Sequence, residues 1–234
     1  MSAFTSFSFL IFPFTIVIRI EAMNVSEKMK TNPVTCSPEI NIYDAQDLME
    51  REGVHHLPVL EDGHLVGIIS DKDLMKATLN SSSPLSIHKM AYMLSRLVVR
   101  DVMTTELVTT DANAAVEEAC RIMVDNEISC LPIVENDKLL GIITKTDMYR
   151  ILLDLFGARH FGVKADFYVK DKPGAIAEIT AVLAQKGADI VSIGSLKRSN
   201  GEGSVTIKVQ GITKDMLSEI LSDMAVRIVD IREI

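Results

Sequence analysis

The sequence contains an internal repeat: residues 29–77 recur as residues 103–151 at a constant offset of 74, without a gap. The densest match pairs residues 57–62 (LPVLED) with residues 131–136 (LPIVEN). Self-similarity at a fixed offset means that one supersecondary unit is used twice. We therefore expect two equivalent units, each burying an apolar face against the other.

Both copies predict the same order of elements, β-α-β-β-α. Short strands are expected around residues 34–35 and 108–109, each followed by an amphipathic helix. Two apolar strands joined by a polar turn come next, at residues 57–60 and 65–69 in the first copy. A second helix then begins at Ser70, and the second copy repeats this order.

The hairpin of each copy is followed by the pattern Gly-x-x-[Ser/Thr]-x-x-Asp, at Gly67 in the first copy and Gly141 in the second. This pattern after a Leu-Pro hairpin resembles the CBS domain family, over about residues 25–155. The resemblance implies a pseudo-twofold pair of repeats with two clefts for adenosine-type ligands. AMP, ADP, ATP or S-adenosylmethionine is then the expected regulatory ligand, and no cofactor is required.

The residue types of this pattern suit a nucleotide. A glycine lets a ligand approach the backbone closely, and a helix start at Ser70 or Thr144 offers free N–H groups to a phosphate. The carboxylates of Asp73 and Asp147 could accept hydrogen bonds from a ribose. The same residues also form a capping box that merely closes the helix start, and the sequence leaves both interpretations open.

The family resemblance assigns the Asp to ribose, the hydroxyl to ribose or phosphate, and the apolar strand residues to adenine. His56, Arg100 and Lys145 are candidate phosphate partners, with solvent exposure as the alternative. The full set of expected nucleotide-binding residues is Thr35, His56, Pro58, Gly67, Ser70, Asp73, Arg100, Thr109, Pro132, Gly141, Thr144, Lys145 and Asp147.

The last 75 residues follow a different pattern. Apolar residues alternate over 161–169, and a helix is expected from the turn at 171–174 to Gly187. Two more strands, a helix and a fourth strand complete the order βαββαβ, the ferredoxin-like arrangement. The positions expected to be buried on the two helices are Ile176, Ile179, Leu183, Met216, Leu217, Ile220 and Leu221. The whole chain is thus predicted to be an α+β protein.

The Asp-x-Pro-Gly turn and the later Gly-Ala-Asp-Ile stretch resemble the ACT domain, over residues 160–234. That resemblance implies a small effector, often an amino acid, bound between paired domains by Asp171, Gly174, Asp189 and Ile190. Many amino-acid-binding members carry Asn where this chain has Asp189, whose charge would repel a carboxylate. A dimerisation module is therefore the alternative. A CBS pair followed by an ACT domain resembles the AcuB type of acetoin utilization protein.

Composition narrows the function further. The net charge of −8 argues against a nucleic-acid partner. The three cysteines show no C-x-x-C spacing, which fits a reducing cytoplasm. No nucleophile elbow or P-loop is present, and the adjacent His55 and His56 would point to opposite faces of a strand, so no metal site is expected. The sequence predicts a non-catalytic sensor for an unidentified regulated protein, with an interaction scaffold as the alternative.

Residues 4–20 are strongly apolar but contain Pro13. The leader could be a disordered segment or a mis-called start before Met23, a membrane anchor, or a targeting signal. A membrane partner is expected only if this leader is real. Exposed strand edges favour a homodimer. The expected divisions are a leader at 1–22, repeats at 23–80 and 99–158, a linker helix at 81–98, and the C-terminal domain at 160–234.

Overall fold

The computed structural model describes residues 23–80, 96–224 and 226–234. The predictions for the leader and for the helix between the repeats fall mainly on residues outside these ranges. Contacts divide the chain into one unit ending at Ile143 and a second beginning at Thr144. The boundary lies earlier than the predicted start of the C-terminal domain at residue 160.

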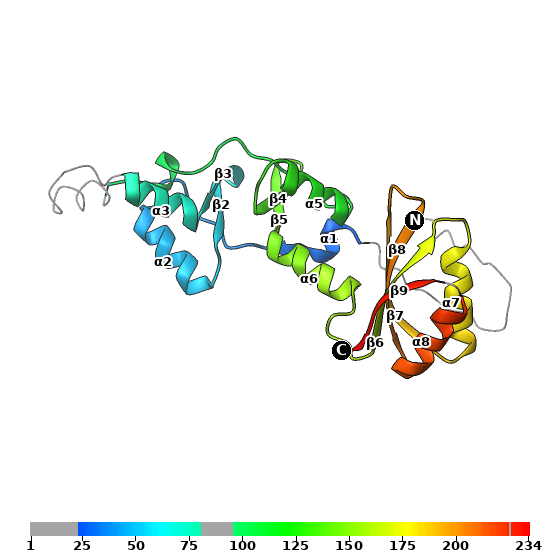
Figure 1. Cartoon of the computed structure of the whole chain (residues 1–234). Helices are drawn as coiled ribbons and strands as arrows, with labels where there is room; N and C mark the ends of the chain where they lie inside the picture. The colour runs from blue at the N-terminus through cyan, green and yellow to red at the C-terminus, as the bar shows by residue number, and fades with distance from the viewer. Residues whose placement is uncertain (1–22, 81–95, 225) are drawn as a thin grey trace, which may run out of the picture. The chain divides into compact units, whose positions relative to one another are not determined.

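The first unit consists of two hairpins with their flanking helices (Figure 1). Helix α2 begins after Asn41, whose side chain accepts a hydrogen bond of 2.9 Å from the N–H of Tyr43, and it ends at Gly53, whose φ is 63°. The elements are α1 (Val25–Lys28), β1 (Lys30–Thr31), α2 (Ile42–Glu52), β2 (His56–Glu61), β3 (His64–Ser70), α3 (Asp71–Asn80), the 3₁₀ helix η1 (Val99–Asp101), α5 (Val116–Asp125), β4 (Cys130–Glu135) and β5 (Lys138–Thr144).

The two repeats exchange the segments that precede them. β1 pairs antiparallel with β5, so that Lys30 lies opposite Ile142. The equivalent pair 74 residues away is Thr104 with Ile68, joined by two backbone hydrogen bonds of 2.9 and 3.0 Å. Each leading segment thus adds to the hairpin of the other repeat, which gives the pair its pseudo-twofold character.

The prediction of strands at residues 34–35 and 108–109 is wrong. Each is reduced to a single parallel bridge one residue later, Cys36 with Val59 and Thr110 with Ile133. In the first repeat, Pro33 and Pro38 flank the bridge, and neither can donate a backbone hydrogen bond to extend it.

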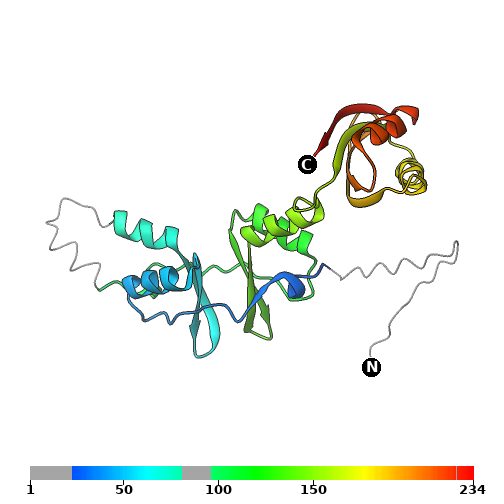
Figure 2. The ribbon, with the colours of Figure 1, turned by 90° about the horizontal axis from the view of Figure 1, so that it is seen from below.

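The second unit is a four-stranded antiparallel sheet with two helices on one face, preceded by α6 (Figure 2). The strand order is β7-β8-β6-β9, and the predicted order βαββαβ is observed after α6. The elements are α6 (Lys145–Leu155), β6 (Val163–Lys170), α7 (Ala175–Gln185), β7 (Asp189–Lys197), β8 (Glu202–Gln210), α8 (Lys214–Asp223) and β9 (Arg227–Glu233).

The core of this unit lies between the helices and one face of the sheet. Ala165, Phe167 and Ile207 contribute from the strands, and Leu183 and Leu217 contribute from the helices. The prediction that Ile176 and Met216 are buried is wrong, since they are 37% and 40% exposed. The other five predicted positions are buried, and Ala175 is buried beside Ile176, so only the edges of the two apolar faces differ from the prediction.

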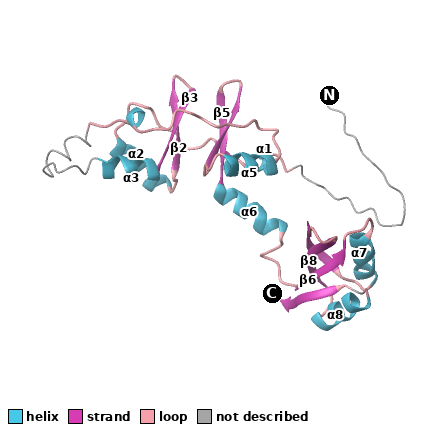
Figure 3. Ribbon diagram, turned by 45° about the horizontal axis from the view of Figure 1, so that its top comes forward, coloured by secondary structure: helices cyan, strands magenta, loops and turns pink. Residues whose placement is uncertain are grey.

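Both units mix helices and strands, as Figure 3 shows by colour. Among the described helices, none combines the length and the apolar character that crossing a membrane requires.

Candidate functional site

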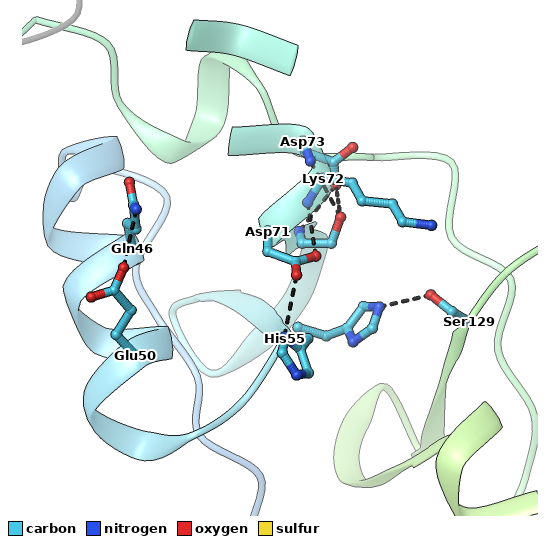
Figure 4. Close-up of polar contacts among 9 residues, drawn as sticks. Gln46, Glu50, His55, Asp71, Lys72, Asp73 and Ser129 are labelled. Carbon is cyan, nitrogen blue, oxygen red and sulfur yellow. Dashed lines mark hydrogen bonds and ion pairs between the residues drawn. The ribbon is translucent and has the colours of Figure 1, made fainter. Parts of the chain in front are cut away.

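The Ser70–Asp73 pair of the first repeat forms a closed capping box. Asp73 Oδ2 accepts hydrogen bonds from the Ser70 N–H at 3.0 Å and the Ser70 hydroxyl at 2.7 Å. The Asp73 N–H in turn donates to the Ser70 hydroxyl at 3.4 Å. Asp73 lies on the first turn of α3 (Figure 4). Its second oxygen, Oδ1, has no hydrogen-bond or ion-pair partner among the described residues.

The Thr144–Asp147 pair of the second repeat forms the same box at the start of α6. Asp147 Oδ2 accepts from the Thr144 N–H at 2.9 Å and from the Thr144 hydroxyl at 2.6 Å. Here, however, Oδ1 accepts a hydrogen bond of 2.8 Å from the guanidinium of Arg150. Both oxygens of Asp147 are therefore engaged, whereas one oxygen of Asp73 remains open.

His56 connects the two repeats. It lies opposite Ser70 in the β2–β3 ladder, and its Nε2 is 2.8 Å from the hydroxyl of Ser129 in the second repeat. Burial lowers the pKa of the His56 imidazole, although the charge of Asp71 acts in the opposite direction. The structure thus brings His56, Ser70 and Asp73 together at one end of the first hairpin.

The remaining predicted strand residues lie on the same two hairpins. Pro58 and Pro132 are buried, and their carbonyls accept hydrogen bonds from Cys36 and Thr110. Thr35 and Thr109 each come directly before those donors and therefore run beside the same strands. Each repeat thus bonds the residue after its threonine to its buried proline.

The two glycines of the motif have a role that the sequence did not suggest. A Cβ on Gly67 would collide with the side chain of Met103, and one on Gly141 would lie 2.7 Å from the backbone oxygen of Lys30 and 2.8 Å from the sulfur of Met29. In this structure, parts of the exchanged segments therefore occupy the space expected for a ligand. The glycines allow those segments to pack closely on the hairpins.

Arg100 does not join Ser70 and Asp73. Its guanidinium pairs with Glu39 at 2.7 Å and with Glu61, and Glu61 lies beside the turn of the first hairpin. Glu61 and His56 are the two ends of one strand, about 17 Å apart at 3.3 Å per residue, and Ser70 lies beside the His56 end. Lys145, by contrast, is half-buried at the first position of α6, next to Thr144.

The structure also shows a groove that the sequence did not predict. It measures about 650 Å³ and lies against α2 and α3, with Gln46, Glu50, His55 and Asp71 among its lining residues. His55 Nδ1 lies 3.2 Å from Asp71 Oδ2, and Gln46 donates to Glu50 at 3.1 Å (Figure 4). In the sequence, the signal for this groove was the pair of adjacent histidines, because His55 lines the groove while His56 faces Ser129.

The four predicted effector residues of the C-terminal unit do not meet within one molecule. Asp171 and Gly174 precede α7, while Asp189 and Ile190 follow it and begin β7. An 11-residue helix is about 16 Å long, so the two pairs lie at opposite ends of α7. A site containing all four would need residues from two copies.

Metal-ligand side chains do not gather anywhere in the described ranges: no cluster of three or more His, Cys, Asp or Glu could hold an ion.

Comparison with known proteins finds a match to the family described as "CBS domain" at residues 24–80 and 99–154. The CBS domain-containing protein YhcV from Bacillus subtilis is 32% identical over 125 residues, which cover 53% of this chain and 82% of that protein. Homoserine O-acetyltransferase from Methanosalsum zhilinae is 30% identical over 132 residues, 56% of this chain. The match spans only 24% of that enzyme.

Two solved structures are similar to part of this chain. A putative acetoin utilization protein (AcuB) from Vibrio cholerae has 29% identity and a TM-score of 0.49, covering 58% of this chain and 94% of its own. CBSX2, solved in complex with AMP, has 29% identity and a TM-score of 0.47, covering 56% and 96%. The paired repeats and the Bacillus subtilis relative, most of whose length is matched, show that this chain belongs to the CBS domain family.

Proposed function

We propose that the chain is a non-catalytic regulatory sensor that binds an adenosine-type nucleotide in its CBS pair. The observation that carries this proposal is the capping box of the first repeat. Asp73 Oδ2 closes the helix start, while Asp73 Oδ1 has no partner among the described residues. The residue can therefore serve as a cap and as a ligand group at the same time.

The open oxygen suits a ribose. A carboxylate oxygen accepts hydroxyl protons, and hydrogen bonds to a charged acceptor are roughly twice as strong as neutral ones. Asp147 lacks this capacity while Arg150 occupies its second oxygen. We therefore assign the principal nucleotide site to the first repeat, with Ser70 and Asp73 at the ribose and the start of α3 toward the phosphate.

The position of this site suggests how binding could be transmitted. His56 lies opposite Ser70 and also contacts Ser129 in the other repeat. A ligand at Ser70 and Asp73 would thus favour one arrangement of the two repeats, and couplings of this kind are typically about 1–3 kcal/mol. An unidentified regulated protein would respond to that arrangement. A role in acetoin or related carbon catabolism, in the cytoplasm, belongs to the same proposal.

Thermal unfolding of the full chain tests the proposal against AMP, ADP, ATP and S-adenosylmethionine. A nucleotide that binds only the native state at 100 times its dissociation constant adds about 2.7 kcal/mol of stability. We expect a saturable rise in the melting temperature with at least one of the four. A melting temperature unchanged by all of them would leave the scaffold as the better function.

An oligomeric scaffold is the second candidate, and exposed apolar residues on and after α6 favour it. Tyr149 is 63% exposed, and Leu152, Leu155 and Phe156 are each about half exposed. A contiguous group of exposed apolar residues on a protein surface is typical of an interaction site. We propose that it contributes to a homodimer, and light scattering coupled to gel filtration should show a mass near twice 25.8 kDa. Leu152→Glu should return the chain to a monomer.

The C-terminal unit is proposed to be an ACT domain, which would make amino-acid-responsive regulation a further alternative. The support is the Asp-x-Pro-Gly turn together with the βαββαβ order. Because Asp171 and Asp189 lie at opposite ends of α7, such an effector would bind between two copies. Binding would then require the dimer, so Leu152→Glu should abolish it.

A further inference from the structure

Two lysines face each other on the side of the C-terminal sheet that α7 and α8 do not cover. Ala165 and Ile207 point into the core from β6 and β8, so their neighbours Lys164 and Lys208 lie on the opposite face. The two lysines are direct partners in the β6–β8 ladder. Like charges directly opposite each other destabilise a sheet. Their pairing therefore calls for a compensating group.

Lys164 has such a group, but Lys208 does not. The ammonium of Lys164 pairs with Asp166 at 2.5 Å. Lys208 is only 3% exposed, and it donates to the backbone oxygens of Gly157 at 2.8 Å and His160 at 2.9 Å. An ammonium has three donors, so one is left without an acceptor among the described residues. A buried ammonium without an anionic partner is costly.

A cavity of about 370 Å³ adjoins these lysines. Its polar lining residues are Lys164, Lys208, Ser192 and Thr206, and its other lining residues are Phe156, Ala158 and Ile234. The hydroxyls already donate to other groups, Ser192 to the Phe156 carbonyl at 3.1 Å and Thr206 to Asp166 at 2.5 Å. The donors left for a ligand are therefore the two ammonium groups.

We propose that this cavity binds a small organic monocarboxylate with a short apolar tail. The carboxylate would bridge the ammonium groups of Lys164 and Lys208 and supply the missing anion. The tail would pack against Phe156 and Ala158. An amino acid fits poorly, because its own ammonium would meet two more positive charges. The site goes beyond the proposed nucleotide site and does not depend on it.

The connecting segment, residues 156–161, would be stabilised by this ligand. Lys208 holds it through the carbonyls of Gly157 and His160, and Gln210 donates to the carbonyl of Phe161. Because the same ammonium would bind the carboxylate, ligand binding and the position of this segment are linked. The amide resonances of residues 156–161 should therefore report on occupancy.

The test is a nuclear magnetic resonance titration of the ¹⁵N-labelled full chain with isovalerate, and separately with isovaleramide. The two probes have nearly the same shape, but only isovalerate carries a charge. We expect isovalerate to shift the amides of residues 156–158 and 206–208 saturably, with an affinity at least about tenfold above that of isovaleramide, because charged hydrogen bonds are the stronger ones. Equal affinities, or no saturable shift with isovalerate, would overturn the proposal.

Two variants locate the site. Ala158→Leu should fill the cavity while keeping both lysines, and it should abolish the isovalerate shifts. Lys208→Met removes the ammonium and should do the same, and if that variant fails to fold, Ala158→Leu still decides. The control Lys186→Met removes an equal charge from an exposed position on the helical side of the unit, and it should bind like the parent. Unchanged isovalerate binding by Ala158→Leu would contradict the proposed site.

Discussion

The two CBS repeats have the same backbone pairing but different side chains at the ends of their hairpins. The bridges Lys30–Ile142 and Thr104–Ile68 are equivalent at the offset of 74. By contrast, His55-His56 in the first repeat corresponds to Ser129-Cys130 in the second. Glycines and apolar residues that recur thus establish the paired fold. Polar residues that do not recur make the two candidate sites unequal.

The largest expected effect is a difference in stability between alanine variants at the two motif glycines, Gly67 and Gly141. A Cβ at Gly141 would lie 2.7 Å from a backbone oxygen, whereas one at Gly67 would meet only the flexible side chain of Met103. Gly141→Ala should therefore lower the free energy of unfolding by about 2–3 kcal/mol, the upper part of the usual range for overpacking, and Gly67→Ala by clearly less. Urea unfolding followed by circular dichroism measures both. Equal losses would mean that the two exchanged segments are packed alike.

Arg150→Ala should make the two capping boxes more alike. It releases Oδ1 of Asp147, which then resembles the open oxygen of Asp73. We expect nucleotide affinity at the second repeat to rise about tenfold, which equals about 1.4 kcal/mol. Calorimetric titration should then show a second site, while stability changes by less than about 1 kcal/mol because the side chain of Arg150 is largely exposed. An unaltered titration would mean that Arg150 does not limit the second site.

Ser129→Ala tests the contact between the repeats. It removes the 2.8 Å hydrogen bond to His56 and should lower stability by about 1 kcal/mol, a typical net value for such a bond. The measurement is again urea unfolding, with Ser26→Ala, an exposed serine of α1, as the control. If both variants lose the same small amount, His56 does not hold the repeats together.

The smallest expected effect is a pH dependence confined to the first repeat. Burial holds the pKa of His56 below its ordinary value of 6.5. The unfolded chain therefore binds the proton first, and the contribution of His56 to stability falls as the pH drops below about 6.5. His56→Gln should make the fall in melting temperature between pH 7 and pH 5.5 shallower. Parallel curves for the parent and the variant would exclude this titration.

The sequence predicted the repeats and the order of the C-terminal elements, because the apolar periodicity that encodes them is local. It also placed Ser70 with Asp73 and Thr144 with Asp147, since a capping box spans only three residues. It did not place Arg100, whose partner Glu61 is 39 residues away. Nor did it reveal that Met29 and Met103 fill the space beside the glycines, because segment exchange is a tertiary feature.

The buried cation of the C-terminal unit was equally hidden. Lys208 occupies an inconspicuous place in the alternating pattern of β8, and its partners are the carbonyls of Gly157 and His160. Backbone carbonyls carry no residue-specific signal, so the contact could be recognised only in the folded chain.

The central claim is that the first repeat binds an adenosine-type nucleotide through Asp73. Its most direct test is calorimetric titration of the full chain and three Asp→Asn variants with AMP. We predict that Asp73→Asn lowers the affinity at least about tenfold, because it replaces a charged acceptor by a neutral one. Asp147→Asn and the turn control Asp62→Asn should bind like the parent. Equal binding by Asp73→Asn and Asp62→Asn would contradict the claim and leave Asp73 as a helix cap alone.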